Sequence, residues 1–235
     1  MAMDTAPNLT SGEIELVRDL ALFAGLDPDG LREVSSKLKR RRFRRGEVVY
    51  HTEDLPGSLY VVLKGELTLR LQSPAGKHYT MSWISPGSFF GTISLLDGQE
   101  RIADAVAVTP CELLVLGRDD FRDFLRSYPH QAEVLLEITA ARWRNTMRRL
   151  ADLAFLDVPG RLAKTLLEFQ RAGGRSEDAQ GVTSITQTEL AAMIATSRES
   201  VGRCLKVFQD AGLIEVDGKR VRVLQRSGLE QRIRW

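Results

Sequence analysis

The spacing of apolar residues changes along the chain and predicts two kinds of structure in its first half. Residues 1–12 are expected to form a loose tail. Residues 13–42 are expected to be helical, because apolar side chains recur there at helical intervals: Leu16, Leu20, Leu22, Phe23, Leu31, Val34 and Leu38. From Phe43 the period becomes two, and "ELTLRLQ" places Leu67, Leu69 and Leu71 on one face of a strand. Several such strands separated by turn signals predict a β-sandwich or barrel over about residues 43–117.

A long helix is predicted next, over residues 129–157. Its seam residues are spaced by three and four: Leu136, Thr139, Trp143, Thr146, Leu150 and Leu153. This heptad spacing suits pairing with a second copy of the same helix, over a length of roughly 40 Å at the rise of an α-helix. The alternative is an amphipathic helix that lies on its own domain.

The pattern of residues 158–235 predicts a winged helix-turn-helix. Residues 158–169 are helical and residues 171–181 form a loop. "TQTE" is a capping box that begins a helix at Thr186, and a second helix runs from near Ser197 to a C-terminal glycine, Gly212. Two alternating strands then surround Asp217–Gly218, a preferred two-residue hairpin turn.

Composition changes this picture only modestly. A chain of 235 residues suits two small domains or one large one, and 43% hydrophobic with 27% charged residues is ordinary for a globular protein. The net charge is +2, but residues 158–235 hold 13 Lys+Arg against 9 Asp+Glu, a mildly basic balance compatible with nucleic acid. Two distant cysteines and no apolar signal segment favour the cytoplasm. The uncharged stretch 79–96 contains serines, glycines and a proline, which indicate strand, turn and strand and no membrane span.

The second helix of the helix-turn-helix carries the candidate DNA-reading face. Val201, Cys204, Leu205 and Phe208 share one side and are expected to face the core. The other side carries Arg198, Glu199, Gly202, Arg203 and Lys206, as a helix in the major groove requires.

Each residue type on that face has a chemical counterpart on DNA. An arginine can donate to guanine O6 and N7 together, and a carboxylate can accept from the cytosine amino group. The small Gly202 keeps the centre of the face low. Hydroxyls at the helix starts are candidates for phosphate contacts, and they belong to Thr186, Thr188, Ser197 and Ser200. The alternative is a solvated helix with intrahelical Glu–Arg pairs.

Three segments in order resemble the Crp/Fnr family of bacterial transcription regulators, and most of all its cyclic AMP receptor protein branch. They are "FFGTISLLDGQERIADA" (89–105), "LAFLDVPGRLAKTLL" (153–167) and "SRESVGR" (197–203), within a likeness that covers about residues 15–225. The resemblance implies an α+β homodimer: an N-terminal cyclic-nucleotide-binding-like β-roll (a jelly roll) over 13–128, a dimerisation helix over 129–157 and a DNA-binding domain over 158–235. It further implies that Arg198, Glu199 and Arg203 read a half-site resembling TGTGA in an inverted repeat, and that RNA polymerase is a partner.

The same resemblance implies an effector site, with departures. Gly91 and Arg101 match the family's phosphate-binding segment, and Thr146 matches the position that contacts the adenine. However, Thr92 stands where the branch has the ribose-binding glutamate, Ile102 stands where it has a serine or threonine, and Met147 replaces a serine. Each lost bond to a charged group is worth about 1–3 kcal/mol, so cyclic AMP is uncertain as the effector. A different nucleotide, another anion or no ligand stays open, as does pairing of Arg101 with Asp104 or Glu100.

Other classes of function are less well supported. Four cysteines would be needed for an iron–sulfur sensor, and His78 is an isolated candidate for a haem ligand. The run "KLKRRRFRRG" (37–46) is interpreted as a solvated helix end and first strand. The competing hypothesis is a β-roll sensor that regulates an enzymatic or protein-interaction activity without DNA readout. No nucleophile–base pair, metal-ligand spacing or phosphate loop supports an enzyme.

Overall fold

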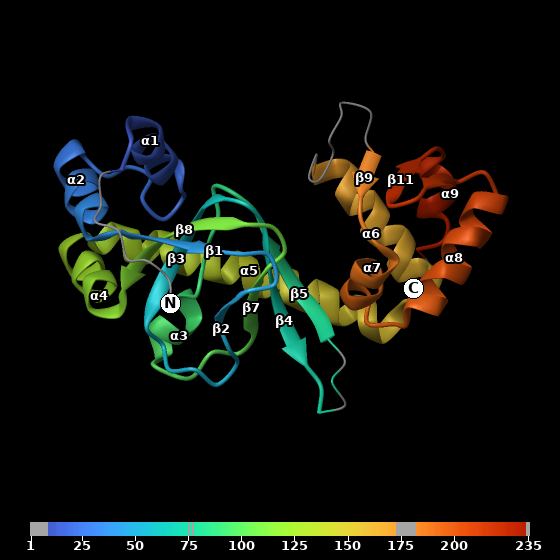
Figure 1. Ribbon diagram of the computed structural model, residues 1–235, viewed down its shortest axis with the longest axis horizontal. Helices are drawn as coiled ribbons and strands as arrows, with labels where there is room; N and C mark the ends of the chain where they lie inside the picture. The colour runs from blue at the N-terminus through green and yellow to red at the C-terminus, as the bar shows by residue number, and fades with distance from the viewer. Residues whose placement is uncertain (1–8, 75, 77, 173–181, 234–235) are drawn as a thin grey trace. The chain divides into compact units, whose positions relative to one another are not determined.

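The computed structural model describes residues 9–74, 76, 78–172 and 182–233 (Figure 1). The chain divides into two compact units, Met1–Ala141 and Arg142–Trp235. A long helix, α5 (Pro129–Phe155), begins in the first unit and ends in the second. The predicted α+β class is confirmed: a β-roll of eight strands, a long helix and a C-terminal helix-turn-helix.

The roll of the first unit consists of two four-stranded antiparallel sheets. One sheet has the order β1 (Lys39–Phe43), β8 (Cys111–Gly117), β3 (Ser58–Lys64) and β6 (Phe89–Phe90). The other has the order β2 (Val48–Tyr50), β7 (Asp104–Ala107), β4 (Leu67–Gln72) and β5 (His78–Ile84). Strand β3 is buried on both faces, since Val61 packs in the core shared with the helices and Val62 packs inside the roll. This explains why "LYVVL" is continuously apolar and does not alternate.

Four further helices belong to the first unit: α1 (Ser11–Asp19), α2 (Pro28–Lys37), α3 (Thr92–Asp97) and α4 (Arg118–Ser127). The predicted helical stretch 13–42 is therefore wrong at its end, because Lys39–Phe43 form strand β1. These basic residues are recruited by a distant partner, β8, with Arg42 opposite Glu112 and Phe43 opposite Cys111. Such a partner cannot be seen in local periodicity.

The uncharged stretch 79–96 also differs in part from expectation. It forms strand β5 and strand β6 as predicted, but its last residues lie in helix α3. Gly91 precedes α3 with a φ of 87°, a left-handed conformation that favours glycine. Among the described residues, no helix is both long and apolar enough to cross a membrane.

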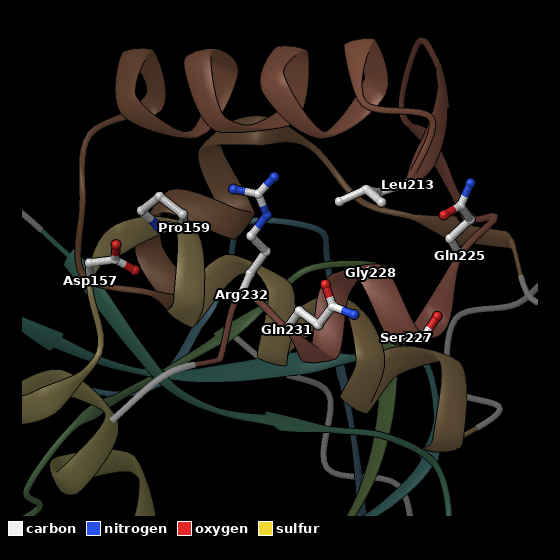
Figure 2. Close-up of a pocket in the computed structure, with 8 residues that line it drawn as sticks. All are labelled: Asp157, Pro159, Leu213, Gln225, Ser227, Gly228, Gln231 and Arg232. Atoms are coloured by element: carbon white, nitrogen blue, oxygen red, sulfur yellow. The ribbon is translucent and has the colours of Figure 1, made fainter.

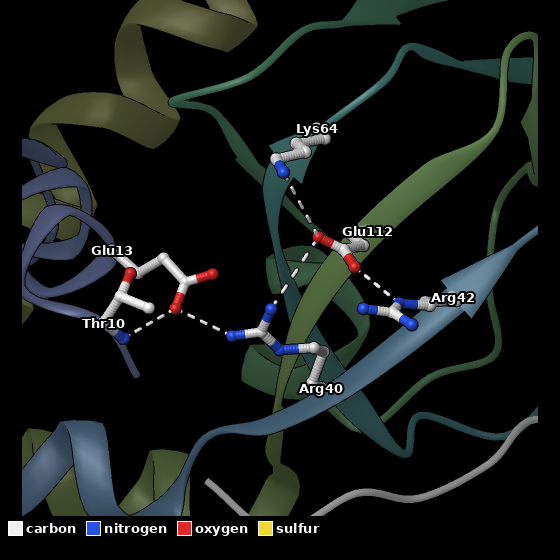
Figure 3. A network of polar contacts seen from close by, with 6 residues as sticks. All are labelled: Thr10, Glu13, Arg40, Arg42, Lys64 and Glu112. Atoms are coloured by element: carbon white, nitrogen blue, oxygen red, sulfur yellow. Dashed lines mark hydrogen bonds and ion pairs between the residues drawn. The ribbon is translucent and has the colours of Figure 1, made fainter. Parts of the chain in front are cut away.

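A network of charged side chains fastens α1 to the roll (Figure 3). The carboxylate of Glu13 accepts hydrogen bonds from the Thr10 amide at 2.8 Å and from Arg40 at 2.7 Å. Arg40 also lies 3.7 Å from the carboxylate of Glu112, which Arg42 and Lys64 approach as well. Burial alone would raise the pKa of Glu13, but the hydrogen bonds from Thr10 and Arg40 outweigh it and hold this pKa below its usual range.

Replacing Glu13 with glutamine is expected to destabilise the protein near neutral pH by about 1 kcal/mol, because the partner of Arg40 loses its charge. A carboxyl group with a lowered folded-state pKa stabilises above its unfolded pKa and loses this effect as the pH falls through the folded value. The difference between wild type and Glu13→Gln should therefore close below about pH 4. Urea titrations at several pH values measure it, and a difference that persists at low pH would contradict the ionic explanation.

The second unit contains α6 (Val158–Ala172), α7 (Gln187–Met193), α8 (Arg198–Asp210) and α9 (Arg226–Glu230) around a three-stranded sheet of order β10 (Ile214–Asp217), β11 (Arg220–Val223) and β9 (Val182–Ser184). Its core joins these elements through fully buried residues such as Leu162, Leu190, Val201 and Leu229. At the start of α6, Arg161 donates to the carbonyl oxygens of Leu156 and Ile194. It thereby links the end of α5 to the turn between α7 and α8.

Three details of this unit differ from the sequence expectation. The hairpin loop is Gly218–Lys219, one residue later than predicted, since Asp217 pairs with Arg220. Gly218 has a φ of 58°, which allows it to lead the turn. Strand β9 and helix α9 were not predicted, and most of the predicted loop 171–181 lies outside the described residues.

Candidate DNA-binding and effector sites

Helix α8 has the two faces that its sequence predicts. Val201, Leu205 and Phe208 are buried in the core of the second unit, and Cys204 packs against it. Ser197 caps the helix by accepting a hydrogen bond from the Ser200 amide. Gly212 follows the helix end with a φ of 68°, as a glycine at that position commonly does.

The opposite face of α8 presents the predicted DNA-binding residues to solvent. Arg198, Glu199, Arg203 and Lys206 are exposed. The guanidinium of Arg203 donates to the Ser200 hydroxyl at 3.0 Å, and the hydroxyls of Ser197 and Ser200 lie 3.1 Å apart. Ser200 therefore orients Arg203 from within the same helix.

Glu199 is ionised on this face. Its own backbone amide and the side chain of Ser197 stabilise the carboxylate, and the charges of Arg198 and Arg203 add to the effect. Together they hold the pKa of Glu199 below its usual range. An ionised carboxylate can only accept hydrogen bonds, which matches the amino group of cytosine among the base edges.

The predicted phosphate contacts on α7, Thr186 and Thr188, differ in their hydrogen bonding and exposure. The capping box at Thr186 is confirmed: its hydroxyl accepts from the Glu189 amide, and the Glu189 carboxylate bonds back to Thr186. Thr188 is exposed on the first turn of α7. A Cβ atom added at Gly202 would lie 3.3 Å from Oε1 of Gln187, so this glycine admits the α7 side chain against α8.

The predicted effector residue Arg101 is buried inside the first unit, with 3% of its surface exposed. Its guanidinium donates to the carbonyl oxygens of Gly91 at 2.7 Å and Ser58 at 2.6 Å. The ring of Tyr50 lies 4.4 Å from the guanidinium carbon, a cation–π distance. Gly91 is needed at this point, because a Cβ atom there would lie 3.0 Å from Arg101 Nη1 and from the Ser58 carbonyl.

Arg101 has no acidic partner among the described residues. The sequence left pairing with Asp104 or Glu100 open. The Asp104 carboxylate instead accepts from the amide and hydroxyl of Thr52, and among the described residues no ion pair joins Glu100 to Arg101. The interpretation of Arg101 as half of an internal ion pair is therefore wrong.

Three positions depart from the family pattern, and they differ in exposure: Met147 on α5 is 38% exposed. Thr92 is buried, with 3% exposed, in the first turn of α3. Ile102 is 50% exposed, next to Arg101. Thr146 lies on α5 in the second unit, where its hydroxyl donates to the Arg142 carbonyl at 3.0 Å. Its role as an adenine contact stays a prediction.

Comparisons with known proteins match a domain model to each of the two regions that hold these candidate sites. Residues 40–128 match the cyclic nucleotide-binding domain, and residues 160–232 match the Crp-like helix-turn-helix domain. A CRP-like cAMP-activated global transcriptional regulator of Mycobacterium tuberculosis is 33% identical, over 94% of this chain and 99% of the relative. The cyclic AMP receptor protein of Thermus thermophilus is 34% identical, over 89% and 95% of the two chains.

The chain belongs to the Crp/Fnr family. A solved Crp/Fnr-family transcriptional regulator from Thermus thermophilus has the same fold, with a TM-score of 0.68 and 27% identity over 83% of this chain and 97% of that one. The protein is thus a DNA-binding transcription regulator with a cyclic nucleotide-binding domain. The competing hypothesis of a β-roll sensor that regulates an enzymatic or protein-interaction activity without DNA readout is wrong, because the chain has a Crp-like helix-turn-helix domain and its relatives are transcription regulators.

Sequence reasoning missed two features of this Crp/Fnr chain. One is the aromatic group beside Arg101, formed by Tyr50, Tyr60 and Phe90. The other is a cavity of about 640 Å³ in the second unit, where Arg232 extends into the space beside Pro159 (Figure 2). Its lining comes from the start of α6, the ends of the wing hairpin and α9: Asp157, Pro159, Leu213, Gln225, Ser227, Gly228, Gln231 and Arg232. The cavity could not be anticipated because α9 was not predicted.

Proposed function

We propose that this Crp/Fnr protein is a homodimer that reads an inverted repeat with TGTGA-like half-sites through Arg198, Glu199 and Arg203. The observation that carries the proposal is the exposed Arg–Glu–Arg face of α8, on which Ser200 orients Arg203 and Glu199 is ionised. The two arginines match the two guanines of TGTGA, and the carboxylate matches a cytosine that pairs with one of them on the complementary strand. Phosphate contacts beside these bases are proposed for Thr186, Thr188, Ser197, Ser200 and Lys206.

The exposed seam of α5 supports a second copy of the chain as the partner. Leu136, Trp143 and Leu150 are 68%, 63% and 57% exposed, which is unusual for large apolar side chains spaced at helical intervals. The hydroxyls of Thr139 and Thr146 donate to carbonyl oxygens of their own helix, at Leu135 and Arg142. Their methyl groups are therefore left for the seam, so the two threonines do not oppose pairing.

The roll is proposed to sense a small anionic effector at Arg101. The support is a buried guanidinium whose only described acceptors are neutral carbonyl oxygens. Two relatives are named as a cAMP-activated regulator and a cyclic AMP receptor protein, which makes a cyclic nucleotide one candidate. RNA polymerase is proposed as a further partner and the cytoplasm as the compartment, both by analogy with the family.

A gel-shift titration tests the DNA-reading proposal. A duplex with two TGTGA half-sites in inverted repeat should be retarded at far lower protein concentration than a duplex with the same bases scrambled. Half-sites moved apart by half a helical turn should bind weakly, since two recognition helices related by two-fold symmetry need a fixed spacing. Equal retardation of all three duplexes would refute sequence-specific reading.

Cyclic AMP is expected to bind weakly and the ligand-free protein to bind DNA appreciably. The reason is that Thr92 and Ile102 replace two polar partners, each worth about 1–3 kcal/mol. A ligand shifts DNA affinity only if it binds the DNA-competent state better than the other state. DNA titrations with and without millimolar cyclic AMP, on wild type and Arg101→Ala, measure this. A negligible ligand-free affinity that rises steeply at micromolar cyclic AMP, and does not rise in Arg101→Ala, would contradict the prediction.

A further inference from the structure

Arg101 has a hydrogen-bond donor that the protein does not satisfy. Its Nη1 and Nη2 groups donate to carbonyl oxygens, but its Nε is buried without a partner. A buried N–H without an acceptor is costly, and an uncompensated buried charge more so. A native structure keeps such a group where a bound molecule satisfies it or where strain is stored.

The charge of Arg101 is also not neutralised from nearby. The Asp104 carboxylate is bonded to Thr52, and that of Asp54 accepts from the His51 amide. Burial raises the pKa of Tyr50 and of Tyr60, although the charge of Arg101 opposes the rise, so both hydroxyls stay protonated near neutral pH. The guanidinium therefore keeps a full positive charge that an anion would balance.

The surroundings of this cation are apolar. Tyr50 covers one face of the guanidinium, and the Tyr60 ring centroid lies 5.9 Å from its central carbon. Phe90 stacks on Tyr60 with ring centroids 5.1 Å apart. A ligand beside these rings would find apolar contact area for its carbon atoms and few hydrogen-bond partners for its polar groups.

Two exposed aliphatic side chains lie on the two hydrogen-bonded segments next to Arg101. Arg101 and the 53–54 segment exchange hydrogen bonds, from the Arg101 amide to the Asp54 carbonyl and from the Glu53 amide to the Arg101 carbonyl, each at 2.9 Å. Leu55 and Ile102 are the next residues on the two segments, and they are 81% and 50% exposed. Apolar surface of this kind beside a buried cation is what an amphipathic anion would cover.

We propose that the Arg101 site binds a small organic acid, in which one carboxylate bonds to Arg101 and an attached apolar chain or ring packs on Ile102 and the Tyr50 side. This inference rests on the proposed effector-sensing role and names the chemical class of the effector. A carboxylate is planar and matches the N–H edge of a guanidinium. A cyclic nucleotide also supplies an anion, but by the resemblance Thr92 replaces its ribose-binding carboxylate and the apolar, half-exposed Ile102 replaces a hydroxyl partner.

Calorimetry on the full-length protein tests the class of ligand with graded probes. Octanoate and phenylacetate should bind at least about tenfold more tightly than acetate or inorganic phosphate, because only the first pair has an apolar body. Octanamide, which keeps the body and lacks the charge, should bind at least about tenfold more weakly than octanoate. Cyclic AMP should bind more weakly than octanoate. The inference fails if acetate equals octanoate, or if cyclic AMP binds more tightly than every acid.

Side-chain NMR locates the binding. The ¹⁵N-labelled Nε–H signal of Arg101, assigned by its loss in Arg101→Lys, should move on addition of octanoate and not of octanamide. Ile102 is half-exposed, so Ile102→Ser is a second variant that should leave the fold intact. This variant should bind octanoate about tenfold more weakly than wild type and cyclic AMP more tightly. Binding of octanoate that leaves the Arg101 signal unchanged, or that is unaffected in Ile102→Ser, would place the acid elsewhere and overturn the inference.

The same samples separate this inference from the proposed function. Retardation of the TGTGA duplex without any acid binding would leave DNA reading intact and refute the organic acid. Acid binding at Arg101 without retardation of any duplex, with or without acid, would refute DNA reading and leave the ligand class standing.

Discussion

Replacing Trp143 with glutamate is expected to convert the protein from dimer to monomer and to lower its affinity for the inverted repeat by about a hundredfold or more. Trp143 is 63% exposed at the middle of the α5 seam, between Leu136 and Leu150. In a paired helix this position is enclosed by the partner, so a carboxylate there would lose its water without gaining a cation. The loss of DNA affinity follows because each monomer then holds a single half-site.

Asn145→Glu is the matched control for this change. Asn145 is exposed two residues further on, on the side of α5 away from the seam, and the substitution alters the net charge equally. It should leave the dimer intact. Light scattering at micromolar concentration measures the mass, and gel shifts measure DNA affinity. A wild-type monomer, or equal effects of both variants, would show that the seam is not a dimer contact.

The recognition helix could be predicted from the sequence because its signals are local. The apolar period of Val201, Leu205 and Phe208 sets the buried face, Ser197 marks the start and Gly212 the end. All of these lie within about one helix length of one another, where spacing alone determines which side chains share a face. The capping box at Thr186 was found for the same reason.

Strand β1 was partly missed because its signal is not local. Lys39–Arg42 carry no apolar pattern, and their strand exists because β8 lies about 70 residues later in the chain and pairs with them. Helix α9 is similar. Its one buried residue, Leu229, is part of the same core as Leu213, which lies far from it in local sequence pattern. Gly228 also packs against Leu213, since a Cβ atom on Gly228 would lie 2.4 Å from that side chain.

Arg101 could be identified as the candidate effector residue by resemblance, but its surroundings could not be predicted from the sequence. Arg101 is held by the carbonyl oxygens of Ser58 and Gly91, and backbone acceptors leave no trace in residue type. Tyr50 lies against Arg101 from β2, a strand of only three residues that is far from Arg101 in the sequence. The departures at Thr92 and Ile102 predict weak binding of cyclic AMP. Only the three-dimensional arrangement indicates which other anion would suit it.

Replacing Arg203 with alanine is expected to lower affinity for a matched inverted repeat by at least about thirtyfold and to relax the preference for guanine at one position of each half-site. The loss of a bidentate guanine contact costs about 1–3 kcal/mol, and a symmetric dimer loses it twice. The side chain is exposed on α8 and oriented by Ser200, so its removal should not disturb the core built by Val201 and Leu205. Gel shifts on duplexes with each base substituted in turn measure the preference.

Lys206→Ala serves as the comparison, because Lys206 lies on the same exposed face and also loses one positive charge in the variant. A phosphate contact carries no base information, so Lys206→Ala should weaken matched and scrambled duplexes by similar factors and reduce the salt dependence of binding. Arg203→Ala should instead reduce the ratio between matched and scrambled duplexes. If both variants preserve the wild-type ratio, Arg203 contacts the backbone only, and the sequence must be read by other residues of α8.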